Sequence, residues 1–371
     1  MTLSFDSDTR PMIDITDYGA VGDGATDSTE AVRAALAAAA AAGGTVLVPE
    51  GRFSVRGLAV PNGVRGIQGV SPASYQNHRT GSVLELRREG AERALLDLSG
   101  CKDLFCRDLA LVGFGRGRDR PAACGVLVDL PEHGGHGGLG SCLVLDGLCV
   151  EEFSLDCLHL QNAGVVTIRH CIAGNAGRHG LLAHLWDGWI LDCMFPGNAR
   201  CGIYAEESVA SLTITGNRIE WNNVAGVWCR NAYRLSLVGN TIDYSGCVGM
   251  HFEDANALAV SGNVFWRSGC PFGPIPPELA SDPYANAHAR FKRCRGVAFS
   301  GNVLHAGLHR DVPGAWRPHH GLVLEGLSHS AFTGNSLWGA GAQSAIADLG
   351  GHGEGLVLAG NAASPAEGDC D

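Results

Sequence analysis

The chain of 371 residues has no hydrophobic run as long as the roughly 20 residues that a membrane-spanning helix needs, and no cluster of basic side chains. Its 27 Lys and Arg are outnumbered by 38 Asp and Glu, and the formal charge of −11 argues against nucleic acid as a partner. None of its 14 cysteines forms a Cys-x-x-Cys pair, the common spacing of structural zinc sites. We therefore expect no membrane, nucleic acid, metal or other cofactor.

A secretion signal is also missing from the sequence as given. The first residues, Met1–Asp6, have neither the basic start nor the apolar segment of a signal peptide. Several cysteines fall at repeating positions that would point inward, so we expect reduced core thiols rather than disulfides. Both observations predict an intracellular, cytoplasmic protein.

The sequence does contain a repeat with a constant period. Five similar segments end at Cys171, Cys193, Asn217, Asn240 and Asn263, and successive ends are 22 to 24 residues apart. Nine residues after each of the first four ends, a glycine opens a short apolar strand. The same position is expected to continue at Cys106 and Cys149 on one side and at Asn302, Asn335 and Asn361 on the other. A fixed period of alternating apolar strands is typical of a solenoid.

A period near 23 with β-branched strands and Gly-Asn turns favours a parallel β-helix, in which each rung is one coil of short strands. Asparagines at the repeated position would form a hydrogen-bonded ladder, and cysteine would fill the same place as a small apolar side chain. We predict one all-β domain over residues 1–371, with repeated rungs over 101–361. Longer steps place loop insertions near 131–141, 270–287 and 308–319.

The N-terminal part predicts a helix in front of these rungs. Asp27, with Glu30 three residues later, is a candidate N-cap in a capping-box arrangement. The alanine-rich stretch Ser28–Ala42 should be helical and should end at Gly43.

The segments on either side of this helix, Asp17–Gly24 and Gly44–Gly51, resemble the start of pectate-lyase-like right-handed β-helix proteins. That superfamily includes polygalacturonases, mannuronan epimerases, fructan-cyclising transferases and phage tailspikes. The resemblance implies a right-handed single-stranded parallel β-helix whose N-terminal capping α-helix lies within residues 13–50. It also implies a site on the outer face of one parallel sheet.

Strand alternation predicts which side chains point away from the core. If the residue after each opening glycine is buried, the second and fourth residues point outward. Aligned from rung to rung, these residues form two columns on one sheet. The first column is His159, Leu182, Tyr204, Trp228, His251 and Arg290, and the second column is Gln161, His184, Glu206, Arg230, Glu253, Lys292 and Glu325. Rings beside charges at successive rungs indicate a functional face, although a self-neutralising charged surface is the alternative.

The candidate catalytic residues in these columns are Glu253, His251, Glu206 and Arg230. Glu206 and Glu253 lie two rungs apart, roughly 9–10 Å between Cα atoms, which leaves room for the water of inverting glycoside hydrolysis. Arg230 stands between them and should keep both carboxylates ionised. His251 could act as acid or base near neutral pH, and Glu253 is expected to lie at the centre of the site.

The candidate substrate-binding residues are His184, Tyr204, Trp228, Arg290, Lys292 and Glu325. Tyr204 and Trp228 could stack on sugar rings or another flat ligand. The triplet Arg290-Phe291-Lys292 resembles the Arg-x-Lys of polygalacturonases, which implies that both cations hold a substrate carboxylate. The Asn-Thr-Asp and Asp-Asp motifs that carry the catalytic aspartates of that family are absent.

Three functions fit these residues. The first is a carbohydrate-active enzyme, a glycoside hydrolase, transferase or lyase acting on an oligosaccharide. The second is a cyclase that tailors secondary metabolites, such as a polyketide cycloaddition enzyme, in a cleft lined by Trp228, Tyr204 and Trp266. The third is a non-catalytic glycan-binding solenoid. The expected partner is an oligosaccharide or other small molecule, and a homo-oligomer, either a trimer or a dimer, fits the fold that the resemblance implies.

Overall fold

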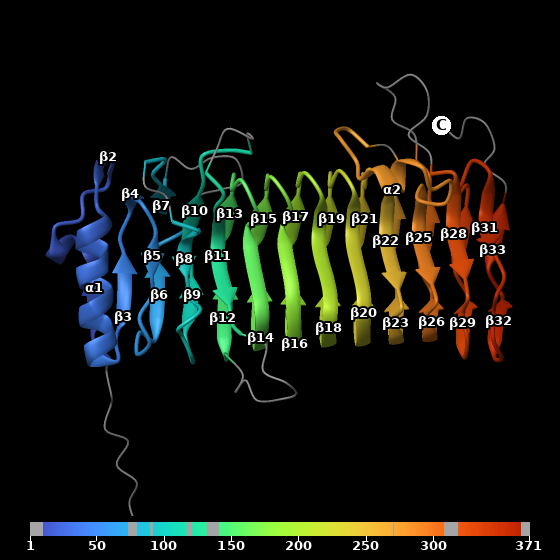
Figure 1. Cartoon of the computed structure of the whole chain (residues 1–371), viewed down its shortest axis with the longest axis horizontal. Helices are drawn as coiled ribbons and strands as arrows, with labels where there is room; N and C mark the ends of the chain where they lie inside the picture. The colour runs from blue at the N-terminus through green and yellow to red at the C-terminus, as the bar shows by residue number, and fades with distance from the viewer. Residues whose placement is uncertain are drawn as a thin grey trace, which may run out of the picture.

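The computed structural model describes residues 10–72, 80–89, 92–116, 121–131, 141–269, 271–307 and 318–364. Within them the chain winds into coils of short strands, and the strands of successive coils pair in parallel. Figure 1 shows the coils side by side along one axis, from α1 at one end to β31 and β33 at the other. No helix in this described part is long and apolar enough to cross a membrane. The loops predicted near 131–141 and 308–319 fall almost entirely outside the described residues.

Three parallel sheets form the sides of the coil. The first, called the site sheet below, contains β5 (Leu58–Ala59), β8 (Ala94–Asp97), β11 (Cys124–Asp129), the first halves of β14 (Leu158–Arg169), β16 (Leu181–Leu191), β18 (Cys201–Thr215) and β20 (Ala225–Val238), then β22 (Val248–Glu253), β25 (Ala287–Lys292), β28 (His320–Glu325) and β31 (Ser344–Asp348).

The second sheet contains β1 (Met12–Asp14), β3 (Thr45–Val48), β6 (Gly66–Gly69), β9 (Phe105–Arg107), β12 (Leu143–Asp146), the second halves of the same four long strands, β23 (Asn256–Ser261), β26 (Arg295–Ser300), β29 (Ser330–Thr333) and β32 (Leu356–Ala359). Because the long strands run through both, the site sheet and the second sheet form one continuous set of 20 strands.

The third sheet has 13 strands, one from each successive coil. They are β2 (Asp23–Asp27), β4 (Gly51–Val55), β7 (Ser82–Leu86), β10 (Ala110–Val112), β13 (Cys149–Glu151), β15 (Ile172–Gly174), β17 (Met194–Pro196), β19 (Arg218–Glu220), β21 (Thr241–Asp243), β24 (Val264–Trp266), β27 (Val303–His305), β30 (Ser336–Trp338) and β33 (Ala362–Ser364).

A sharp corner separates the site sheet from the second sheet. At this corner the backbone has a positive φ, between 51° and 63°, at Asn162, Glu207, Asn231, Asp254 and Arg293. Asparagine and aspartate enter this left-handed region more easily than other residues with a side chain. Each corner residue directly follows a member of the predicted second column. The corner therefore places that column along the edge of the site sheet.

The predicted asparagine ladder is confirmed. The backbone N–H of Asn217 donates to Oδ1 of Asn240 at 3.0 Å, and that of Asn240 donates to Oδ1 of Asn263 at 2.9 Å. The pattern continues through Asn302, Asn335 and Asn361. At the other end the N–H of Cys171 donates to the sulfur of Cys193 at 3.4 Å, so the thiol takes the place of an amide oxygen. All of these ladder side chains except that of Asn361 are buried.

The extension of the ladder to Cys106 and Cys149 was wrong. Cys149 is the first residue of β13, and the ladder position of that coil is taken by Leu148, directly before it. Cys106 lies within β9 on the second sheet, and the equivalent ladder position is Leu109. These early coils lack Gly-Asn turns, and an apolar side chain occupies the ladder position instead. The spacing of the cysteines therefore did not indicate the register of these coils.

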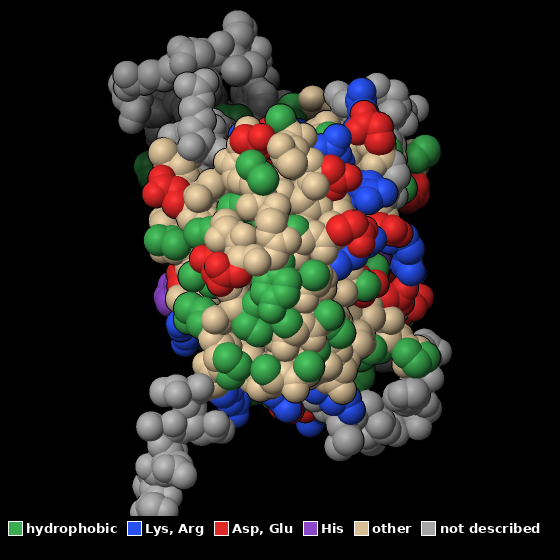
Figure 2. All heavy atoms as spheres, turned by 90° about the vertical axis from the view of Figure 1, so that its left-hand side faces the viewer, with side chains coloured by type: hydrophobic (Ala, Val, Ile, Leu, Met, Phe, Trp, Pro, Cys, Tyr) green, Lys and Arg blue, Asp and Glu red, His purple; other side chains and the backbone are tan. Residues whose placement is uncertain are grey.

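The predicted capping helix is present as α1 (Thr29–Ala42), at the N-terminal end of the coil. Its N-cap is Ser28 rather than Asp27, whose carboxylate instead accepts the N–H of Thr29 at 3.0 Å. Gly43 ends the helix with φ 61°. Figure 2 looks onto this end, where hydrophobic side chains are gathered near the centre and charged ones toward the rim. A short 3-10 helix, η1 (Ile15–Tyr18), packs beside α1.

Candidate functional site

Two columns of outward side chains run along the site sheet in the register that the sequence predicts. Tyr204 pairs with Trp228, Trp228 with His251, and His251 with Arg290. At the corner the aligned residues are Gln161 with His184, then Glu206, Arg230, Glu253, Lys292 and Glu325 in successive strands. The inward positions between them are buried core residues. The alternation therefore holds over all these coils.

The prediction that all these side chains are exposed was wrong. His184, His251 and Arg290 are 4–6% exposed, whereas Tyr204 and Trp228 are half-buried. Neighbouring side chains and the segment 271–286 cover the buried members. A residue that points outward from a β-helix is exposed only if nothing in the adjacent coils lies over it.

Two ring stacks occupy the first column. Tyr204 stacks on His179 with ring centroids 4.5 Å apart, and Trp228 stacks on His251 with centroids 4.0 Å apart. Burial lowers the pKa of His179 to about 3 and also lowers that of His251, so both rings are neutral at pH 7. Trp266, which the sequence suggested for the same cleft, belongs instead to β24 on the third sheet, where its ring lies 4.5 Å from that of His305 at a tilt of 58°.

The carboxylates of the second column have separate cationic partners. Arg230 forms an ion pair with Glu206. Glu253 lies 2.6 Å from Arg293 and 3.2 Å from Lys292, and His251 Nε2 lies 3.6 Å from its other oxygen. The prediction that Arg230 lies between Glu206 and Glu253 in the aligned strands is confirmed. Among the ion pairs that the structure shows, however, Arg230 is joined to Glu206 alone.

The pKa values of the two glutamates move in opposite directions. Burial raises the pKa of Glu206 above its usual value, and the ion pair with Arg230 offsets this only in part. His251, Arg293 and Lys292 together hold the pKa of Glu253 well below its usual range despite partial burial. The expectation that Arg230 keeps its neighbouring carboxylates ionised stays a prediction. The ion pair with Arg230 opposes the rise in the pKa of Glu206 without cancelling it, whereas other partners hold Glu253 ionised.

The segment 271–286, between β24 and β25, lies beside the C-terminal half of the site sheet and contains α2 (Pro277–Ala280). Leu279 and Tyr284 from this segment pack against a hydrophobic cluster that also includes Tyr204 and Trp228. Asp282 forms an ion pair with Arg290. A cavity of about 390 Å³ lies between this segment and residues 246, 247 and 319. No residue of the two columns lines this cavity, so the contacts of Leu279, Tyr284 and Asp282, rather than the cavity, place the loop beside the site.

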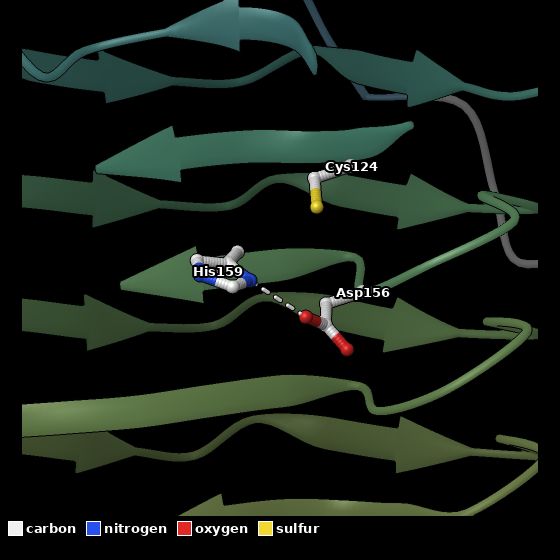
Figure 3. Close-up of side chains that lie close together, drawn as sticks. All are labelled: Cys124, Asp156 and His159. Carbon is white, nitrogen blue, oxygen red and sulfur yellow. Dashed lines mark hydrogen bonds and ion pairs between the residues drawn. The ribbon is translucent and has the colours of Figure 1, made fainter. Parts of the chain in front are cut away.

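A largely buried group of a thiol, a carboxylate and an imidazole lies in the N-terminal half of the same sheet. Figure 3 shows Cys124, Asp156 and His159 together, with the imidazole Nδ1 bonded to Asp156 Oδ2 at 2.8 Å. Arg178 also binds both oxygens of Asp156. Although burial raises it, the hydrogen bonds from His159 and Arg178 lower the pKa of Asp156 to about 2. The guanidinium already supplies the positive charge that a metal would bring, so these donors fit an ion pair better than a metal centre.

Sequence reasoning missed several residues of this site. His179 directly precedes the glycine that opens a strand, and the predicted alternation was applied only to residues after that glycine. Its position in the turn next to the strand is the signal that could have identified it. Arg293 lies at a corner, one residue after Lys292, so its partnership with Glu253 follows from the left-handed backbone. Asp282 comes from a loop, and no periodic pattern predicts where a loop residue lies.

Comparison with known families identifies the fold class. Residues 141–275 and 190–363, together more than half of the chain, match the family described as right handed beta helix region. Residues 12–68 match the family described as rhamnogalacturonase A/epimerase, pectate lyase-like. The chain therefore belongs to the right-handed β-helix proteins of the pectate-lyase-like superfamily, as the N-terminal resemblance implied.

One curated relative is mannuronan C5-epimerase AlgE3 of Azotobacter vinelandii, which is 51% identical over 49 residues, 13% of this chain and 3% of that protein. Among solved structures, the enzymatically active domain of tailspike protein 2 of bacteriophage CBA120 has a TM-score of 0.67 at 12% identity, over 85% of this chain and 47% of that one. The A-module of A. vinelandii mannuronan C-5 epimerase AlgE6 has a TM-score of 0.64 at 17% identity, over 95% and 99%.

DFA-IIIase from Arthrobacter chlorophenolicus A6 is similar over 97% of this chain and 100% of its own, with a TM-score of 0.58 at 15% identity. The chain thus spans less than half of the tailspike domain and 3% of the curated relative. It spans 99% of the AlgE6 A-module and 100% of DFA-IIIase. At these identities the structural similarities establish the fold alone. The neighbours themselves include carbohydrate-active β-helix enzymes.

Proposed function

We propose that this chain is a carbohydrate-active enzyme, a glycoside hydrolase, transferase or lyase, that acts on an oligosaccharide lying along the site sheet. The placement of Glu206 and Glu253 two rungs apart on the site sheet, beside the half-buried Tyr204 and Trp228, carries this proposal, and the opposite directions of their pKa shifts support it. A carboxyl group with a raised pKa can protonate a leaving oxygen, while an ionised carboxylate can orient a water or a sugar hydroxyl. In this assignment Glu206 is the proton donor and Glu253 the fixed anion, which reverses the central role that the sequence suggested for Glu253.

The rest of the site supports sugar binding. Tyr204 and Trp228 present half-buried rings beside these carboxyl groups, and the segment 271–286 lies beside the C-terminal half. Two rungs separate the glutamates, roughly 9–10 Å between Cα atoms, which suits an attack by water more than a direct carboxylate nucleophile. The enzyme names of several structural neighbours agree with carbohydrate chemistry.

Turnover of an oligosaccharide panel by the wild type, Glu206→Gln and Glu253→Gln tests the proposal. Glu206→Gln should lower kcat by roughly 10²–10⁴ on the substrate that is found, the usual contribution of one general acid. Glu354→Gln, which changes an exposed carboxylate at the C-terminal end, is the matched control and should have no effect. Melting curves of all variants establish that the fold is retained.

The same variants separate the alternative functions. If Glu206→Gln and Glu253→Gln retain activity on a non-carbohydrate substrate while Trp228→Ala loses it, the cyclase is favoured. If oligosaccharides bind to the wild type without any turnover, the site is a binding surface.

We also propose an intracellular location, because the twelve cysteines in the described ranges are free and eleven of them are buried. A homo-oligomer, either a dimer or a trimer, remains a proposal that light scattering coupled to size-exclusion chromatography would test.

A further inference from the structure

We infer that the ligand of the site sheet is an uncharged oligosaccharide rather than a polyuronate. This inference rests on the proposed carbohydrate function and goes against the expectation that Arg290 and Lys292 hold a substrate carboxylate. Its basis is the pairing of the cations that project from the site sheet.

Each of the three cations in the two columns already has a carboxylate partner within the protein. Arg230 pairs with Glu206, and Lys292 pairs with Glu253 at 3.2 Å. Arg290 pairs with Asp282 and lies 3.7 Å from Glu325. A substrate carboxylate would have to displace a protein carboxylate that is held in place by the fold, and it would approach a chain whose formal charge is −11.

Two further cations at the edges of the sheet are neutralised in the same way. Arg293 binds Glu253 at 2.6 Å and Asp254 at 2.7 Å, and Arg178 binds the buried Asp156. Arg200 lies exposed in the turn before β18, outside the two columns. The charged groups on the floor of the site therefore form internal pairs, and a string of negative charges would find no matching row of cations there.

Neutral hydroxyl groups, by contrast, have partners available. His179 Nδ1, His251 Nε2 and Arg290 Nε are buried nitrogens that form no hydrogen bond with the described residues, although His251 Nε2 lies 3.6 Å from the Glu253 carboxylate. Sugar hydroxyls both donate and accept, so they can satisfy neutral imidazoles as well as a guanidinium N–H. Two of the three nitrogens belong to rings that stack on the half-buried Tyr204 and Trp228, whose apolar surfaces suit the faces of sugar rings.

Direct binding measurements decide between the two ligand classes. Neutral fructan and glucan oligosaccharides are compared with oligogalacturonate and oligomannuronate of equal length by calorimetry at 50 and 500 mM NaCl. The wild type should bind one of the neutral series at least tenfold more tightly than either uronate, with an affinity that salt leaves unchanged. Tighter binding of a uronate at both salt concentrations overturns the inference, whatever the variants do.

Asp282→Asn supplies a second test, because it removes the nearer of the two carboxylates paired with Arg290 and leaves only Glu325, at 3.7 Å. The variant should gain at least tenfold in affinity for the uronates and keep its affinity for the neutral ligand within about threefold. Asp243→Asn is the matched control: it removes the same charge beside Arg267 on the third sheet and should not improve uronate binding. An equal gain in both variants would show that overall charge, not the site, excludes uronates, and would refute the role given to Arg290.

The outcomes also distinguish this inference from the proposed function. Turnover of a uronate oligosaccharide by the wild type leaves the carbohydrate function standing and ends the inference. If no oligosaccharide of either class binds, both fail.

Discussion

Replacing Asn240 by alanine should destabilise the fold more than most single substitutions, because its side chain joins three coils. The Oδ1 atom accepts the backbone N–H and the Nδ2–H of Asn217, both at 3.0 Å, and Nδ2 donates to Ile214 O and Asn263 Oδ1, both at 2.9 Å. Alanine leaves the Asn217 N–H buried without its acceptor, at about 1–3 kcal/mol, and removes three further bonds of about 1 kcal/mol each. Asn240→Ala should therefore lower the free energy of unfolding by about 4–6 kcal/mol.

Asn240→Cys should lose only about half as much, because a thiol already accepts a ladder N–H at Cys193. Asn256→Ala, at an exposed position of β23, should change stability by less than about 0.5 kcal/mol. Urea unfolding followed by circular dichroism gives all three values. A loss below 1 kcal/mol for Asn240→Ala, or equal losses for the alanine and cysteine variants, would refute the view that the ladder stabilises the coil through satisfied backbone groups.

Two further predictions concern ionisable groups. Burial lowers the pKa of His179 and His288 from 6.5 to about 3, so the unfolded chain takes up these protons first and stability falls as the pH drops below about 6.5. At pH 5 the loss is about 2 kcal/mol for each histidine. Melting curves from pH 7 to 5 should show it, and His288→Phe should reduce the pH dependence by about half. Burial raises the pKa of most core thiols, that of Cys106 to about 12. A thiol reagent at pH 7.5 should therefore leave the eleven buried cysteines of the described ranges unmodified in native protein and titrate close to fourteen thiols after denaturation. Rapid labelling of many thiols in the native state would contradict this packing.

The fold was predictable because every coil of a β-helix repeats nearly the same pattern of buried and outward residues. Each coil must bury alternate residues of its strands, and the same choice in successive coils produces columns that are visible in the sequence, such as Asn217, Asn240 and Asn263. Register errors arose only where the repeat lacks its Gly-Asn turn, as at Cys149. Neighbouring polar side chains can each serve as a helix N-cap, and here Ser28 occupies the N-cap position instead of the predicted Asp27.

The site was only half predictable. Alternation gave the direction in which Glu206, His251 and Arg290 point, because direction depends on the strand alone. It did not give their burial or their partners, since those depend on side chains from other coils and from the non-repeating segment 271–286. The partners of Glu253 illustrate this: Arg293 reaches Glu253 from a corner that the strand pattern does not describe.

The coil-by-coil register of the two columns has a consequence for how such a protein can evolve. Over the coils of the candidate site, each coil contributes one residue to each column, and neighbouring coils share backbone pairing and the asparagine ladder in addition to their ion pairs. Duplication or deletion of one segment of about 23 residues would therefore lengthen or shorten the proposed ligand-binding floor by one strand spacing, about 4.8 Å, and would keep the backbone register on either side. Substrate length and the chemistry of the carboxyl pair can change independently in a molecule built this way.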